Sequence, residues 1–245
     1  MRPPVILTDF VQSDPRLRPH GVSETLPRMP TRVAALCGLA APVVFVVGLV
    51  LGDLSQPDPF DPAHDDISHL GAQTASSPWL YNQIGANLTG LLVVGLGLGL
   101  WSALGRGWAA RLGSAGLLAV GVGMVLDGFL RLDCRGGIDV PCENLSWHAR
   151  AHKVESGITG AALLLTPVVL AFAFRARPGW RSAWIPTLLA VPAIIATSAA
   201  FASIGQGAAS RAGSVAWFLW IGFVAVRLWR ATASPGAPAA DTVQA

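Results

Sequence analysis

The sequence predicts an all-α integral membrane protein: a bundle of six transmembrane helices with both termini cytoplasmic and a disulfide-braced extracytoplasmic loop. The first supporting observation is composition, because 52% of the residues are hydrophobic and only 13% are charged, against a usual charged share of about 25%. The second is that several apolar runs approach the length of about 20 residues that crosses a bilayer. The third is that arginines gather on alternate connections between these runs.

The apolar runs give the order of the predicted spans. We place these spans at about 33–51, 81–104, 112–130, 153–174, 183–204 and 212–229. Together they form one transmembrane domain over residues 33–230, flanked by tails at 1–32 and 231–245 that we expect to be disordered and cytoplasmic. Gly48 and Gly52 in the first span have the spacing that allows close helix packing.

The distribution of basic residues predicts the orientation. With six spans and a cytoplasmic N-terminus, every cytoplasmic connection is basic, as the positive-inside bias requires. The cytoplasmic side then holds Arg2, Arg16, Arg18, Arg28, Arg32, Arg106, Arg111, Arg175, Arg177, Arg181, Arg227 and Arg230. Most acidic residues and four histidines, with Cys134 and Cys142, fall on the opposite side. We therefore expect any chemistry to lie on the outer face.

The charge balance also bears on partners and location. A formal net charge of +3 with dispersed cationic residues is too small to argue for nucleic acid, so we expect membrane lipids as the partners. The arginine-rich composition is typical of a bacterial chain, which predicts the bacterial inner (cytoplasmic) membrane. The sequence leaves the oligomeric state open.

Cys134 and Cys142 lie close together in the loop between the third and fourth spans, with two glycines and a proline between them. In an oxidising compartment this spacing favours a disulfide, which would contribute about 2–3 kcal/mol by restricting the unfolded loop. Free thiols and metal ligation are the alternatives.

His148, His152 and Glu155 follow this loop at a spacing that places them on one helical face. The helix is expected to begin near Asn144 or Ser146, either of which can cap it. Two histidines one turn apart with a carboxylate can hold a transition metal or supply a general base. The alternative is a structural role, in which these side chains hydrogen-bond the loop.

Two aspartates precede the disulfide. Asp127 ends the third span, where an ionisable residue usually faces the bundle interior and has a partner; Arg131 is a candidate partner, and a catalytic role is the alternative. Asp133 is expected either to bind a ligand or to cap the loop.

Three further polar positions are candidates for ligand binding. Ser68 and His69 lie in the first outer loop, beside the membrane. Asn87 is about two turns inside the second span, where its amide must bond across helices or line a polar pocket. Arg211 is expected either to bind an anionic headgroup or to neutralise an acid from another loop.

The pattern Ser68-His69-Leu70-Gly71, the run Arg131-Leu132-Asp133-Cys134, Ser146-Trp147-His148 with His152, and the late Gln206 and Arg211 resemble the bacterial multipass proteins of the domain of unknown function 998 family. The resemblance covers about residues 33–230. It implies a bundle of six helices and no established activity. It singles out Ser68, His69, Asp133, His148, His152 and Arg211.

A looser similarity exists to the membrane hydrolase superfamily that includes alkaline ceramidases, which use serine, aspartate and histidines around zinc. This chain departs from that pattern, since it has six spans and its paired histidines precede the fourth. The similarity is an analogy of fold.

Three functions follow as hypotheses, and the sequence leaves open whether the protein is an enzyme. The leading one is a polar His/Asp pocket on the outer face that binds a lipid headgroup or a cation. The second is a zinc-dependent membrane hydrolase acting on a lipid, in which His69, His148 and His152 hold zinc and Asp127 or Glu155 activates water. The third is a small-solute transporter.

Overall fold

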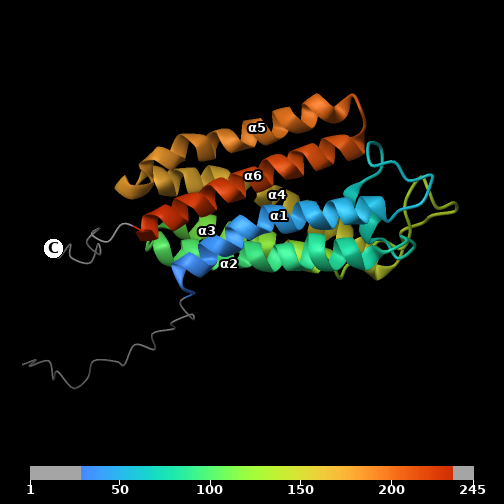
Figure 1. Cartoon of the computed structure of the whole chain (residues 1–245), viewed down its shortest axis with the longest axis horizontal. Helices are drawn as coiled ribbons and strands as arrows, with labels where there is room; N and C mark the ends of the chain where they lie inside the picture. The colour runs from blue at the N-terminus through green and yellow to red at the C-terminus, as the bar shows by residue number, and fades with distance from the viewer. Residues whose placement is uncertain (1–28, 234–245) are drawn as a thin grey trace, which may run out of the picture.

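The computed structural model describes residues 29–233 and is all-α over that part of the chain (Figure 1). Its long helices are α1 (Thr31–Leu54), α2 (Thr89–Ala103), α3 (Trp108–Asp127), α4 (Trp147–Arg175), α5 (Trp184–Ala202) and α6 (Gln206–Ala233). Three short helical segments accompany them: η2 (Ile67–Gly71), η3 (Leu80–Leu88) and η4 (Pro178–Ala183). With η3 continuing into α2, six helices are long and apolar enough to cross a membrane. The protein is an integral multi-pass membrane protein.

Each of the six apolar runs expected to span the membrane lies in a long helix, and several of these helices extend beyond the run. Helix α4 begins at Trp147, before the expected residue 153, and α6 begins at Gln206 instead of residue 212. Hydrophobicity marks the part of a helix that lies in the bilayer, so a helix that continues past the apolar run is longer than its span. Most of the predicted tails lie outside the described residues; Thr31, Arg32 and residues 231–233 belong to helices.

The helices form a closed ring in chain order, because each packs against the next and α6 packs against α1. Close packing of α1 depends on Gly48, as a Cβ at that position would collide with the backbone of Gly85 in η3. This bears out the prediction from the small-residue spacing. Phe45 of α1 stacks on Phe218 of α6 with ring centroids 4.2 Å apart, in the centre of the bundle.

The second span begins as a π-helix, η3, before continuing as α2. Thr89 Oγ1 donates to the carbonyl oxygen of Ile84 at 3.0 Å, five residues earlier, which matches the wider π turn. Such segments are rare and often occur at functional sites. Here the segment buries Tyr81, Asn82 and Asn87.

Helix α4 carries a proline in its interior, and α6 compensates for it. Pro167 has no N–H to donate to the carbonyl of Leu163, four residues earlier. Trp217 Nε1 of α6 donates to that carbonyl instead, at 3.2 Å. The hydrogen bond joins α4 to α6 near the middle of the bundle.

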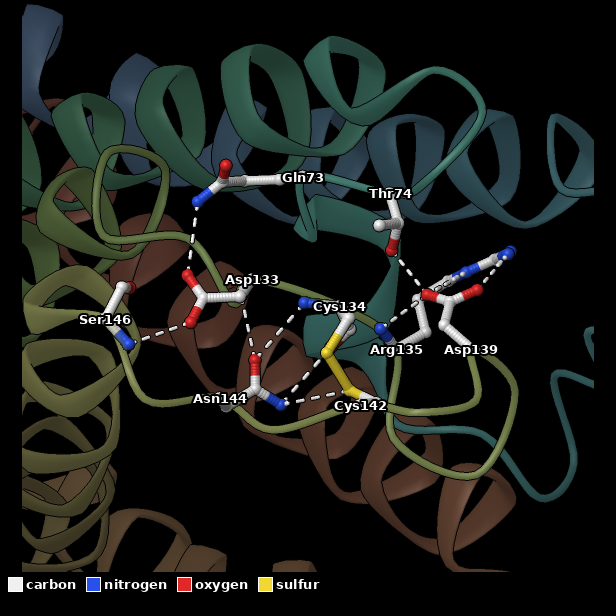
Figure 2. Close-up of a disulfide and its surroundings, with 9 residues drawn as sticks. All are labelled: Gln73, Thr74, Asp133, Cys134, Arg135, Asp139, Cys142, Asn144 and Ser146. Atoms are coloured by element: carbon white, nitrogen blue, oxygen red, sulfur yellow. Dashed lines mark hydrogen bonds and ion pairs between the residues drawn. A yellow bond between two sulfur atoms is a disulfide. The ribbon is translucent and has the colours of Figure 1, made fainter.

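Three connections gather at one end of the bundle, which we call the loop end: the long segments 55–79 and 128–146 and the short link 203–205 (Figure 1). Both ends of the described chain lie at the opposite end (Figure 1). The predicted Cys134–Cys142 disulfide is present in the 128–146 loop, with Cα atoms 5.8 Å apart (Figure 2). Ser146 caps α4 through a hydrogen bond from the Ala149 N–H to its Oγ at 3.1 Å.

Candidate functional site

Three ionisable side chains converge where α3 ends and α4 begins. Asp127 is the last residue of α3, and His152 and Glu155 lie near the start of α4. A spacing of three residues puts His152 and Glu155 on the same face of the helix. One ligand atom from each of the three residues lies within 4.8 Å of the others. We call these residues the acidic-histidine group.

The close approach of α3 to α4 depends on Gly123. A Cβ at Gly123 would collide with Thr159 Oγ1 and would stand 2.9 Å from Glu155 Oε1. The absence of a side chain on α3 therefore leaves the space that the Glu155 carboxylate occupies.

Each member of the acidic-histidine group has an outer partner that orients it. Tyr81 donates its hydroxyl to Asp127 Oδ2 at 3.4 Å, and Thr159 Oγ1 donates to Glu155 Oε1. Ser156 Oγ lies 3.5 Å from His152 Nε2. Partners of this kind fix the orientation of metal-ligating side chains in proteins.

The same group also carries buried polar atoms without hydrogen bonds. His152 and Glu155 are 7% and 8% exposed. His152 Nδ1 lies 3.1 Å from Asp127 Oδ1, yet neither this nitrogen nor Glu155 Oε2 makes a hydrogen bond within residues 29–233. Leaving buried polar atoms unpaired costs about 1–3 kcal/mol each.

The charge of the group is also unbalanced. Two carboxylates beside one imidazole retain negative charge even when the histidine is protonated, and an uncompensated buried charge is strongly destabilising. The group therefore needs a further positive charge, supplied either by a second proton or by a metal cation.

The acidic-histidine group lines a cavity of about 580 Å³, within the usual range of about 300–1,000 Å³ for small-molecule sites. Residues Asp66, Ser68 and His69, on or next to η2, line its loop end. The opposite, deep end is apolar. It is lined by Phe45, Val120, Leu163, Trp217 and Phe218.

Asp133 and Asp139 hold the disulfide loop (Figure 2). Both residues lie outside the cavity lining. Asp133 Oδ2 accepts from the Ser146 N–H at 2.9 Å and its Oδ1 accepts from Gln73 Nε2 at 3.3 Å. Hydrogen bonds from Ser146 hold the pKa of Asp133 below its usual value. Asp139 accepts from Arg135 Nη2 at 2.8 Å and from Thr74 Oγ1. These carboxylates join the 128–146 loop to the 55–79 loop and to the start of α4.

Arg211 forms an ion pair with Asp53, one of the two roles that the sequence left open for it. Arg211 Nη2 lies 2.6 Å from Asp53 Oδ1 and Nε lies 3.2 Å from Oδ2. Its Nη1 donates to the backbone oxygen of Asp65 at 2.8 Å. The side chains of Arg211 and Asp53 are 13% and 17% exposed, so this pair is a substantially buried clamp between α6 and the end of α1.

The structure brings together five of the residues that the sequence singled out: Ser68, His69, Asp127, His152 and Glu155 all line the cavity. His69 Nδ1 lies 3.7 Å from Asp65 Oδ1, and His69 is outside the acidic-histidine group.

Two further candidates, His148 and Asn87, lie outside the lining of this cavity. His148 stacks on Trp147 with ring centroids 3.6 Å apart and lines a separate space of about 260 Å³ with Gln73, Phe129 and Arg131. The expected pairing of Asp127 with Arg131 does not occur, because His152 and Tyr81 contact Asp127 instead. Asn87 is buried and donates to Gln83 Oε1 at 3.1 Å.

Sequence reasoning missed the role of Tyr81. Its place at the start of the second span indicates an interfacial anchor, but the π-helix turns the side chain inward, where it is 7% exposed. The signal available was that this is the single tyrosine of the chain, which alone does not predict a contact with Asp127. Lys153 and Ser156 also line the cavity; Lys153 is the single lysine of the chain, which alone does not predict this position, and Ser156 has no distinguishing sequence pattern.

Comparison with known proteins gives one match. A family model described as "Protein of unknown function (DUF998)" matches residues 39–234. No curated protein and no solved structure matches the chain.

Proposed function

Since the chain belongs to the DUF998 family of unknown function, we propose a function from its geometry: the protein binds a divalent metal cation through Asp127, His152 and Glu155, in a cavity that faces the outside of the cell. The observation that carries the proposal is the convergence of the three ligand atoms within 4.8 Å of one another. Glu155 Oε2 makes no hydrogen bond within residues 29–233, and His152 Nδ1 contacts Asp127 Oδ1 at 3.1 Å; a cation between them would take both atoms as ligands.

The outward orientation is supported by the basic residues at the two ends of the bundle. The short connections 104–107 and 176–183, opposite the loop end, contain Arg106, Arg177 and Arg181. The loop end carries the disulfide, and disulfides persist in oxidising compartments outside the cytoplasm. The positive-inside bias then places both chain ends in the cytoplasm.

The donor set fits a transition-metal dication better than an alkaline-earth ion. An imidazole nitrogen suits zinc, iron or copper, whereas Mg²⁺ and Ca²⁺ prefer oxygen ligands alone. Two carboxylates and a neutral imidazole would compensate a 2+ charge. Tyr81 and Thr159 hydrogen-bond the carboxylates of Asp127 and Glu155, and zinc is the natural test ion.

The direct test is elemental analysis of the purified full chain after loading with zinc and removal of free metal. We expect about one zinc per chain, because the group offers one convergent set of ligands. His152→Ala should lose at least tenfold in zinc affinity, which is the effect expected even of a residue that only orients a metal ligand. His148→Ala is the matched control, since it removes a histidine one turn away on the same helix and should keep the metal. Equal zinc in both variants, or none in the well-folded wild type, would contradict the proposal; in the second case a proton on Glu155 would balance the charge.

A second candidate is metal-dependent hydrolysis of a lipid. It is favoured by the space beside the group: three protein ligands facing an open cavity are typical of catalytic zinc sites. Ser68 and His69 line the same cavity and offer a hydroxyl and an imidazole to a bound substrate. Release of fatty acid or headgroup from a lipid panel that is lost with His69→Ala, at unchanged zinc content, would support this activity.

A further inference from the structure

We infer that the cavity opens sideways into the bilayer between α4 and α6, and that a phospholipid occupies it, with an acyl chain in this opening and its phosphate at Lys153. The inference rests on the proposed metal in one respect, because the metal would offset the carboxylates that otherwise repel an anionic headgroup. We call the gap between Gly160 of α4 and Ser214 of α6 the lateral opening.

The packing of α4 shows where the opening lies. Towards the end opposite the loops, α4 buries Thr166, Pro167, Leu170 and Ala171. Nearer the loop end, the buried residues of α4 are Ala149, His152 and Glu155, and the latter two belong to the acidic-histidine group. A Cβ placed on Gly157 or Gly160 would meet no atom of the described residues within 4 Å.

Helix α5 leaves the opening uncovered. Its buried residues, Thr187, Ala190 and Ile194, stop well before the end of the helix at Ala202. No residue of α5 lines the cavity, whereas Ser156, Thr159 and Gly160 of α4 and Ser214 and Trp217 of α6 do. On the side away from the loop end, the hydrogen bond from Trp217 to Leu163 closes the gap between α4 and α6. The opening is therefore confined to the half of the bundle nearer the loops.

The surroundings of the opening are those of a lipid-facing surface. Val154 and Ile158 of α4 are each 64% exposed, and Ile195 of α5 is 55% exposed. From Lys153 to Leu163 the helix rises by about 15 Å at 1.5 Å per residue, which is roughly half of the ~30 Å hydrocarbon core. The opening therefore spans about one leaflet.

The polarity of the lining matches the order of groups in a phospholipid. Polar residues Asp66, Ser68 and Lys153 lie at the loop end, and the acidic-histidine group lies next to them. The deep end is formed by Leu163, Trp217 and neighbouring apolar side chains. A headgroup at the loop end would thus place an acyl chain against apolar residues, and Lys153, which is exposed, is the cation available to a phosphate.

Two glycines provide a matched pair for testing the opening. Gly160→Leu would fill it, because Gly160 lines the cavity, whereas Gly157→Leu adds the same side chain on the same helix outside the cavity lining. Both changes replace glycine by a strong helix former, and a Cβ at either position meets no atom of the described residues within 4 Å. Both variants should therefore fold.

The experiment is native mass spectrometry of the full chain released from nanodiscs of phosphatidylglycerol. We expect one retained phospholipid on the wild type and on Gly157→Leu, and a lipid affinity about tenfold lower or weaker still on Gly160→Leu, seen as a clear loss of the lipid-bound species. Equal retention by the two variants, or no retained lipid on the wild type, would overturn the inference. A second set of nanodiscs also contains diacylglycerol, which lacks a phosphate. If the wild type retains diacylglycerol as well as it retains phosphatidylglycerol, the assignment of the phosphate to Lys153 is overturned.

Zinc measured in the same preparations separates this inference from the proposed function. Selective lipid loss by Gly160→Leu without zinc in any sample would support the opening and contradict the metal site. Bound zinc with equal lipid retention in both glycine variants would support the metal site and contradict the opening.

Discussion

The Asp139 carboxylate shows how a single charge can hold the disulfide loop. Hydrogen bonds from Arg135, with a further one from Thr74, hold the pKa of Asp139 well below its usual value (Figure 2). A group whose pKa is lowered on folding stabilises the folded state above its unfolded pKa of about 3.9, and this stabilisation is lost as pH falls through the lower folded pKa.

We predict that Asp139→Asn lowers the melting temperature at pH 7, and that the difference from wild type shrinks as the pH falls from about 5 to 3. The neutral amide cannot pair with Arg135 at any pH, so its own melting temperature should lack this pH-dependent component. Thermal unfolding followed by tryptophan fluorescence in detergent checks the prediction. A difference that stays constant from pH 7 to pH 3 would show that the carboxylate charge is not responsible.

Single residues also show the limit of sequence patterns. The spacing of His148 and His152 predicts a shared face, and both begin the same helix, but only His152 reaches the cavity. Residues four apart are offset by about 40° on a 3.6-residue helix, and the first turn of α4 stands beyond the end of α3. His148 consequently packs on Trp147 near the disulfide loop, a position that depends on the neighbouring helix and not on the spacing.

Between elements, Gly123 controls how closely α3 and α4 approach. Gly123→Ala would place a methyl group against Thr159 and Glu155, so we predict a loss of about 1–3 kcal/mol in the free energy of unfolding together with weaker zinc binding. Urea unfolding and zinc titration measure the two effects. Gly157→Ala on the lipid-facing side is the control and should be neutral or slightly stabilising. An unchanged zinc affinity in Gly123→Ala would show that the Glu155 carboxylate does not contribute to the site.

The contact between α4 and α6 rests on a proline and a tryptophan. Trp217→Phe removes the donor for the Leu163 carbonyl and should cost about 1 kcal/mol for the lost hydrogen bond. In a Pro167→Ala background the new N–H can bond that carbonyl, so the same change should cost less. A double-mutant cycle from urea unfolding gives the coupling energy. A coupling near zero would mean that the tryptophan acts through packing alone.

For the whole molecule, Arg211 and Asp53 clamp the last helix to the first at the loop end. Arg211→Ala would leave the Asp53 carboxylate with little solvent and no cation, so we predict a loss of about 3 kcal/mol of stability. The double change Asp53→Asn with Arg211→Gln should recover part of it, because no unpaired charge remains. Thermal unfolding of the two variants distinguishes these outcomes. If the stability of Arg211→Ala lies within about 0.5 kcal/mol of wild type, the ion pair contributes no more than an ordinary surface contact.

The fold was largely predictable and the site only partly so. Apolar runs of membrane length gave the six helices, and the spacing of Cys134 and Cys142 gave the disulfide, because both are local properties of the chain. The acidic-histidine group joins Asp127 to residues more than twenty positions later through the closeness of α3 and α4. That closeness depends on Gly123, and the inward turn of Tyr81 depends on a π-helix; neither leaves a periodic signal in the sequence.

The central claim is that Asp127, His152 and Glu155 hold a metal cation, and X-ray absorption at the zinc edge of the zinc-loaded full chain tests it most directly. The structure predicts a first shell of nitrogen and oxygen at about 2.0–2.2 Å, with the outer scattering of one imidazole. Loss of that imidazole signal in His152→Ala, and its retention in His148→Ala, would complete the assignment. Scattering from two or three imidazoles would contradict it, and would favour a site built from His69, His148 and His152 instead.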